Sequence, residues 1–133
     1  MKTTKMLLCA ALAMLMLANC GGGANSPKDV VLTVFNAAKR LDFATMKKHL
    51  TQERIAKLER REERLKNNPE RRAETIDRVK NAKFEIISEE ISEDGESAVV
   101  IVKISRIKDA SKDYEEEVDL VKIDGIWKID SNV

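Results

Sequence analysis

Apolar side chains recur every three or four residues from Val30 onward, which predicts amphipathic helices. Ser26 supplies an N-cap and Pro27 a first helical residue, so we expect the first helix to begin there. Its apolar face consists of Val30, Val31, Val34, Phe35, Ala38 and Leu41. Asp42 is placed to cap a second, shorter helix. The apolar stripe of that helix is Phe43, Met46 and Leu50.

Residues 51–81 have a sparser apolar pattern, and we expect a charged helical hairpin there. Thr51 offers another N-cap, and the sequence Asn67-Asn68-Pro69 ends one helix and starts the next. Beside the narrow apolar stripe of the first helix, cations spaced three, four and three residues apart form one surface stripe: Arg54, Lys57, Arg61 and Arg64. This stripe is either a solvated face or a contact for anionic head groups or an acidic partner.

After Lys83 the pattern changes to a period of two, which predicts β-strands. The first strand holds the adjacent Ile86 and Ile87, which indicate a bulge or a two-sided strand. Residues 98–104 are apolar on both faces and are expected to form a central strand. Residues 114–123 and 126–130 form two more strands joined by Asp124-Gly125, a two-residue hairpin signal. Helices followed by antiparallel strands predict an α+β fold, with the N-terminal helices packed on a curved antiparallel sheet of about four strands.

The beginning of the chain follows another pattern. Lys2 and Lys5 precede an apolar run over residues 6–18, which is shorter than the roughly 20 residues of a membrane-spanning helix. This is typical of an export signal, which we assign to residues 1–19. The run ends in Leu17-Ala18-Asn19-Cys20, which resembles the lipobox of bacterial lipoproteins. The resemblance implies that the Cys20 thiol receives a diacylglyceryl group and that cleavage makes Cys20 the mature N-terminus; the alternative is an ordinary cysteine behind a non-lipoprotein signal.

The lipobox resemblance sets the expected domain organisation and location. Residues 20–26 become the lipidated cysteine and a Gly-rich, flexible tether, and residues 27–133 a single domain. Each buried acyl CH₂ contributes about 0.8 kcal/mol, so two or three acyl chains such as palmitate anchor a protein durably. Gly21 stands where an aspartate would resemble an inner-membrane retention signal. We therefore expect an exported, membrane-anchored lipoprotein, held at the outer membrane in a host that has two.

The composition limits the kinds of functional site that the chain can form. The chain of 133 residues has one histidine and two cysteines, which argues against a Cys/His zinc site, and we expect no metal and no cofactor. Residues 20–84 hold 16 Lys and Arg against 9 Asp and Glu, whereas residues 85–133 hold 6 against 14. The basic and acidic halves either attract each other within one domain, or the basic half presents a helical surface to an acidic partner. Nucleic-acid binding is disfavoured because the arginines between residues 54 and 80 are interleaved with glutamates and lack stacking aromatics.

The sequence from Val118 to Asp130 combines a hydrophobic strand, an Asp-Gly turn and a strand containing Trp127. Together with the Val34-Phe35 helix and the Leu41-Asp42-Phe43 junction, it resembles the nuclear-transport-factor-2-like (cystatin-like cone) domains of uncharacterised bacterial lipoproteins. The resemblance implies a cone-like sheet. The superfamily includes isomerases, dehydratases and non-catalytic binding modules, so the fold alone does not identify the function.

Enzymes that resemble this fold place an aspartate, histidine or tyrosine in the apolar pocket of the cone. The candidates of these types are Asp42, His49, Tyr114 and Asp119. Each has a structural interpretation, respectively as a helix cap, a helix end, a strand-edge aromatic and an outward strand position. We therefore name no catalytic residue. Trp127 is interpreted as core packing in preference to a ligand-stacking aromatic.

The leading hypothesis is a lipid-anchored cell-envelope domain without enzymatic activity. It would bind a protein partner or a small apolar ligand through the mouth of the cone or through the helical hairpin. The alternative is a small isomerase or hydrolase-like enzyme that uses a carboxylate in the cone pocket.

Overall fold

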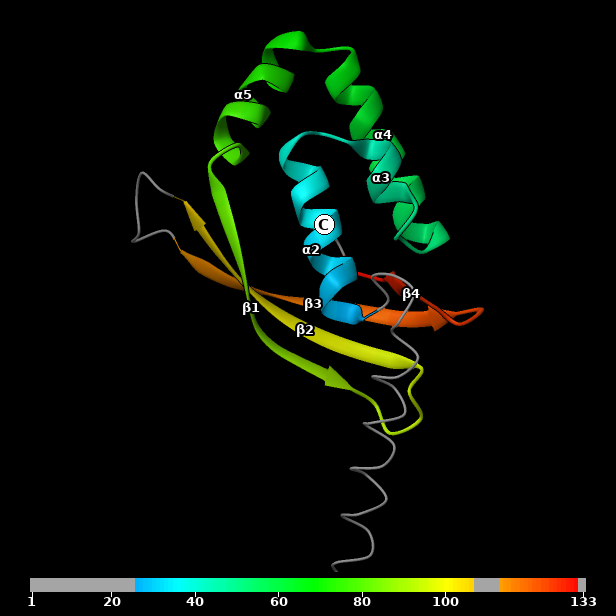
Figure 1. Ribbon diagram of the computed structural model, residues 1–133. Helices are drawn as coiled ribbons and strands as arrows, with labels where there is room; N and C mark the ends of the chain where they lie inside the picture. The colour runs from blue at the N-terminus through cyan, green and yellow to red at the C-terminus, as the bar shows by residue number, and fades with distance from the viewer. Residues whose placement is uncertain (1–25, 107–112, 132–133) are drawn as a thin grey trace, which may run out of the picture.

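The computed structural model describes residues 26–106 and 113–131 of the chain. This part contains four helices followed by a four-stranded antiparallel sheet, with the helices on one face (Figure 1). The predicted α+β class is confirmed, and the sheet is open. The expected signal peptide over residues 1–19 and the expected lipid site, Cys20, lie outside the described residues.

The first two described helices begin at the predicted caps. Helix α2 spans Pro27–Lys39, and its cap Ser26 accepts a 3.3 Å hydrogen bond from the backbone N–H of Asp29. Helix α3 spans Phe43–Lys47, and the carboxylate of Asp42 accepts a 3.1 Å bond from the N–H of Thr45. Both caps satisfy an N–H group that has no partner within its helix, which is why these helices begin where they do.

Helices α4 and α5 form an arch beside α2 (Figure 1). Helix α4 spans Gln52–Lys66 and buries Leu58 and Leu65, whereas α5 spans Pro69–Val79 and buries no residue. Asn68 caps α5 by accepting a 3.0 Å bond from the N–H of Arg71. Thr51 stands directly before α4, as predicted, but its side chain makes no capping hydrogen bond. Its hydroxyl has another partner, described below.

The strands follow one another in sequence order across the sheet: β1 (Ala82–Ile91), β2 (Ser97–Arg106), β3 (Tyr114–Ile123) and β4 (Ile126–Ile129). The register of β1 shifts between Ile86 and Ser88, so the two isoleucines mark a bulge. Strand β2 lies between β1 and β3, as its two apolar faces predicted. Asp124 and Gly125 have φ angles of 52° and 78°, the left-handed values that a tight two-residue turn requires.

A short pairing on the free edge of β4 fixes the start of α4. Leu50 bridges Ile129 in parallel orientation. The N–H of Ile129 donates to the carbonyl of His49 over 2.8 Å, and the N–H of Thr51 donates to the carbonyl of Ile129 over 3.0 Å. The segment before α4 thus behaves as a fragment of a fifth strand, and it holds the first turn of α4 against the end of β4.

The core lies between α2 and the helix-covered face of the sheet. Its fully buried side chains include Val31, Val34, Met46, Val100, Val102, Val118, Leu120 and Ile129. Trp127 is 4% exposed, and the Lys122 ammonium lies 5.1 Å from the centre of its ring. The interpretation of Trp127 as a core residue is therefore confirmed.

Candidate anion-binding site

The four residues considered for catalysis are spread over the fold. Asp42 is a helix cap, and hydrogen bonds from the hydroxyl and the N–H of Thr45 hold its pKa below the usual 3.8. Tyr114 is 46% exposed and belongs to the face of β3 opposite to that of Asp119. Asp42 directly precedes α3, and His49 lies two residues beyond its last residue, Lys47. In the described part of the chain, no side-chain hydrogen bond or ion pair joins any two of the four.

His49 is half-buried just beyond α3. Burial, and then the positive charges of Lys128 and Lys48, lower its pKa from the usual 6.5. The imidazole is therefore mostly neutral at pH 7. Its backbone carbonyl accepts the hydrogen bond from Ile129, so the segment around His49 is part of the support for α4.

Glu116 is a carboxylate that was not among the candidate site residues predicted from the sequence. It is half-buried on β3, on the same face as the buried Val118 and Leu120, and burial raises its pKa above the usual 4.5. The sequence did contain a signal for this position. Residues two apart on a strand lie on the same face, so Glu116 lies on the same helix-covered face as Val118.

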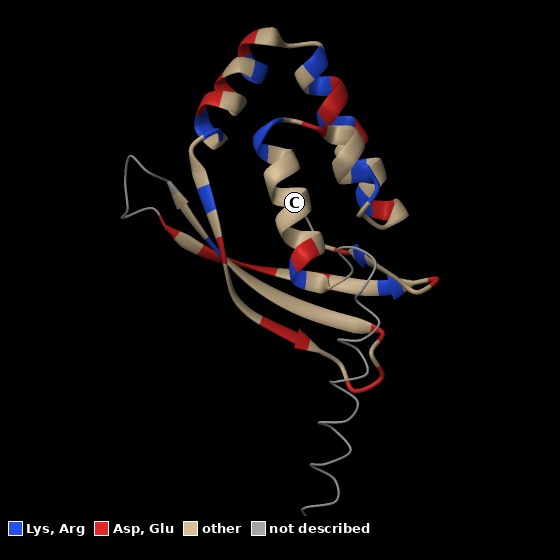
Figure 2. Cartoon of the chain, viewed as in Figure 1, with Lys and Arg blue, Asp and Glu red and all other residues tan. Residues whose placement is uncertain are grey.

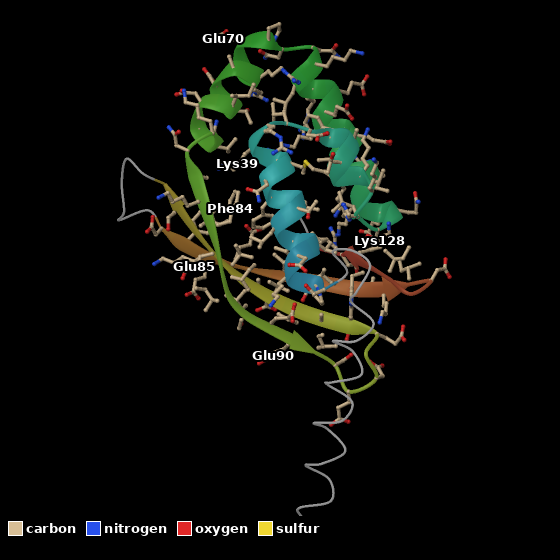
Figure 3. The ribbon with its side chains drawn as sticks, viewed as in Figure 1. Lys39, Glu70, Phe84, Glu85, Glu90 and Lys128 are labelled. Carbon is tan, nitrogen blue, oxygen red and sulfur yellow. The ribbon has the colours of Figure 1, made fainter. Side chains whose placement is uncertain are left out.

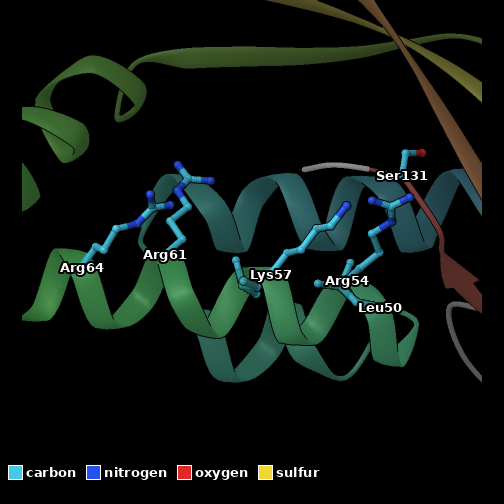
Figure 4. A pocket seen from close by; sticks show the side chains of 7 residues that line it. Leu50, Arg54, Lys57, Arg61, Arg64 and Ser131 are labelled. Atoms are coloured by element: carbon cyan, nitrogen blue, oxygen red, sulfur yellow. The ribbon is translucent and has the colours of Figure 1, made fainter.

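The cationic stripe of the sequence analysis lines a pocket. This pocket, the α4 pocket, has a volume of about 160 Å³ and is lined by Arg54, Lys57, Arg61 and Arg64 together with Leu50, Leu58 and Ser131. Figure 4 shows the four cationic side chains rising from the same side of α4, with Ser131 beside Arg54. Three of the lining residues come from outside the predicted stripe, and two of these, Leu50 and Ser131, lie outside α4. A second hollow beside it is lined by Lys57, Arg60, Glu63 and Arg64.

Arg54 is held in place at one end of the α4 pocket. Its Nε donates a 2.8 Å hydrogen bond to the backbone carbonyl of Asp130, and its side chain is only 18% exposed. The carboxylate of Asp130 lies 4.0 Å from the same Nε and accepts a 2.9 Å bond from the hydroxyl of Thr51. The N–H of Asp130 donates to the carbonyl of Asp119, so β3 fixes this support in turn.

Two glutamates of α4 pair with α3 on the side away from the α4 pocket. Away from the α4 pocket, Glu59 and Glu62 pair with Lys47 of α3, at 3.9 and 2.5 Å. On the pocket side Lys57 pairs with Glu53 at 3.7 Å, and no residue in the described part of the chain pairs with Arg64. Figure 2 shows both signs of charge along α4 and α5, and acidic residues around the turn between β1 and β2. The side of α4 that lines the pocket therefore carries four cations and one glutamate, Glu53.

Neither a metal-binding cluster nor a membrane-spanning helix is present in the part of the chain that the structure describes. Within residues 26–106 and 113–131, no group of three or more His, Cys, Asp and Glu side chains is placed to hold a metal ion. None of the described helices is long and apolar enough to cross a bilayer.

The side chains drawn in Figure 3 place Lys39 and Phe84 between α2 and β1, where the Lys39 ammonium lies 5.7 Å from the centre of the Phe84 ring.

One family model matches most of the chain. A family model described as Domain of unknown function (DUF4878) matches residues 19–130 of the chain. No curated protein and no solved structure matches it. The matched range contains every described helix and strand, and it begins one residue before Cys20.

Proposed function

The chain belongs to the DUF4878 family, and we propose that it is a lipid-anchored, non-enzymatic binding domain of the cell envelope. The family description assigns no activity, so the proposal rests on the geometry. The observation that carries it is the α4 pocket, in which cations spaced along one helix are gathered on one side. The pocket would receive an anionic group presented by an envelope molecule.

The spacing of the cations is unfavourable for the helix by itself. Lys57 and Arg61 are four residues apart, and like charges at this spacing destabilise a helix by a few tenths of a kcal/mol. Arg61 and Arg64 are three residues apart and are also neighbours. A bound anion would offset this repulsion. Binding therefore gives a physical reason for a pattern that solvation alone does not require.

The form of the surface favours a single anionic group over a flat bilayer. Glu53 and Glu63 are exposed on α4 near the cationic side, and they would be repelled by a uniformly negative membrane surface. A recessed site avoids this repulsion because one protruding group contacts only the lining side chains. The lipid at Cys20 would supply the attachment to the membrane, and the α4 pocket would remain for a partner.

The test measures retention on heparin, a polyanion probe, as salt is raised. The mature chain carries Cys20→Ala, so that no lipid is attached. Arg61→Glu combined with Arg64→Glu should lower the salt concentration for elution. Arg71→Glu combined with Arg72→Glu makes the same change of charge on α5 and should shift elution much less. Equal shifts for the two pairs, with both variants folded by circular dichroism, would contradict a binding role for the α4 pocket.

A second candidate function is favoured by Glu116. A half-buried carboxyl with a raised pKa suits a general acid or base, which an isomerase or a hydrolase-like enzyme would need. This candidate predicts that hydrolysis of activated aryl esters, or isomerisation of small ketones, is lost in Glu116→Gln. Activity should persist in Glu117→Gln, which changes the other face of the same strand. Equal activity in both variants would remove Glu116 from this role.

A further inference from the structure

We propose that the group bound in the α4 pocket is a phosphate, either a monoester or a diester. This inference rests on the binding role proposed above and names its ligand. It follows from the size of the pocket, from the type and spacing of its donors, and from its apolar wall.

The volume sets the size of the group. About 160 Å³ is close to the ~150 Å³ of an engineered cavity that admits benzene. A tetrahedral phosphate with the first atoms of its ester fits a space of this order, whereas a whole nucleotide or a folded peptide segment does not. The pocket therefore selects one functional group, and the rest of the ligand would lie outside it.

The donors match a multivalent oxyanion. Three of the four cations are arginines, whose planar guanidinium groups present paired N–H donors to two oxygens at once. Lys57 adds a compact charge between Arg54 and Arg61 (Figure 4). A phosphate monoester carries a charge of about −1.5 to −2 at pH 7 and three acceptor oxygens, against one charge and two oxygens for a carboxylate. The neighbouring cations of α4 are used more fully by a phosphate monoester, whereas a diester carries one charge and differs from a carboxylate in its tetrahedral shape and its additional ester oxygens.

One end of the site is organised before a ligand arrives. The bond from Arg54 Nε to the carbonyl of Asp130 fixes the guanidinium at the pocket margin, so that little side-chain freedom would be lost on binding. Leu50 and Leu58, which are 2% and 4% exposed, form the wall towards the core. An apolar wall excludes water on that side and strengthens the attraction between the cations and an anion.

A phosphate reaches the envelope in two forms that share this chemistry, as a lipid head group and as a free phosphate ester. The structure assigns the phosphate, and the experiment separates the sources. It uses the mature chain with Cys20→Ala, labelled with ¹⁵N, at constant ionic strength. The probes are inorganic phosphate, glycerol 3-phosphate, acetate as a carboxylate reference, and vesicles of phosphatidylglycerol in phosphatidylcholine.

The expected result is that inorganic phosphate shifts amide resonances of residues 50–65 and 131, and binds at least tenfold more tightly than acetate. Arg61→Lys keeps the charge but removes the paired donors, and it should weaken phosphate binding about tenfold without changing the fold. Arg72→Lys, on α5, should leave binding unchanged. Tighter binding of glycerol 3-phosphate supports a free ester as the ligand, whereas vesicle binding that inorganic phosphate displaces supports a lipid head group.

Equal affinities for phosphate and acetate, or resonance shifts spread evenly over the basic surface, would overturn the phosphate assignment. Unchanged phosphate binding in Arg61→Lys would overturn it as well. The binding role is judged separately, because retention on heparin that depends on Arg61 and Arg64 would still support an anion-binding surface. If retention were lost only in the variant that combines Arg71→Glu with Arg72→Glu on α5, both the binding role and the phosphate assignment would be contradicted.

Discussion

The hydroxyl of Thr51 donates a 2.9 Å hydrogen bond to the carboxylate of Asp130, which lies 79 residues further along the chain. The backbone of Asp130 holds Arg54 at the same time. These contacts fasten the first turn of α4 to the end of β4. They explain why Thr51, which stands at the N-cap position of α4, directs its hydroxyl to Asp130 and not to the N–H groups of the helix.

This relationship predicts a coupling between the two side chains. Thr51→Val and Asp130→Ala should each destabilise the protein by about 1 kcal/mol, and the double variant by less than the sum, because each removes the same hydrogen bond. Denaturant unfolding of the four proteins in a double-mutant cycle measures this. Additive effects would show that the bond contributes nothing beyond the separate side chains.

Trp127 is predicted to be the largest single contributor on β4. Trp127→Ala should reduce the free energy of unfolding by about 3–5 kcal/mol because it leaves a large cavity in the core. Ile126→Ala is the control on the same strand, since Ile126 is 50% exposed and should cost far less. Urea unfolding provides the comparison. A midpoint for Trp127→Ala near that of the unsubstituted protein would contradict the buried position.

His49 should give the protein a dependence of stability on pH near neutrality. Its pKa in the folded chain is below 6.5, so the unfolded chain binds more protons as pH falls through about 6.5, and the free energy of unfolding decreases. Asp42 and Asp94 also have lowered pKa values, but their effect begins only near pH 4 and below. Thermal unfolding between pH 8 and 5.5 should lose this slope in His49→Gln. The same slope in the variant would assign it to another group.

Glu116 is predicted to act in the opposite direction. Burial raises its pKa above 4.5, so the folded protein favours the protonated form, and stability is lost as pH rises through the raised value. Glu116→Gln should therefore be more stable than the unsubstituted protein at pH 7 and equal to it near pH 4. Glu117→Gln, on the exposed face, serves as the control. A destabilised Glu116→Gln at pH 7 would show that the carboxylate makes a favourable contact.

The lipid anchor is tested by Cys20→Ala in the full chain. The lipobox resemblance predicts that the variant is no longer labelled by a radioactive fatty acid and leaves the membrane fraction. Cys9→Ala is the matched control, because Cys9 lies within the expected signal peptide and should have no effect on labelling. Persistent labelling of Cys20→Ala would refute the assignment. In a host with two membranes, recovery in the inner membrane alone would refute the outer-membrane prediction.

Much of the fold was predictable because its signals are local. The caps at Ser26, Asp42 and Asn68 act over three residues, and each helix begins where its cap predicted. The turn at Asp124-Gly125 depends on two residues that adopt positive φ. The candidate site was predictable only as a cationic stripe, since helical spacing places Arg54, Lys57, Arg61 and Arg64 together whatever the rest of the chain does.

The sequence by itself therefore determined the order and type of the elements, the side of α4 that carries the cations, and the core position of Trp127. Tertiary structure alone decided that the stripe lines a pocket, because Leu50 and Ser131 close it from other segments. It also decided that Thr51 and Arg54 both bond to Asp130, which lies 79 and 76 residues further along the chain, respectively. No local pattern encodes such contacts, because they exist only after the packing of β4 beside the start of α4 brings the two segments together.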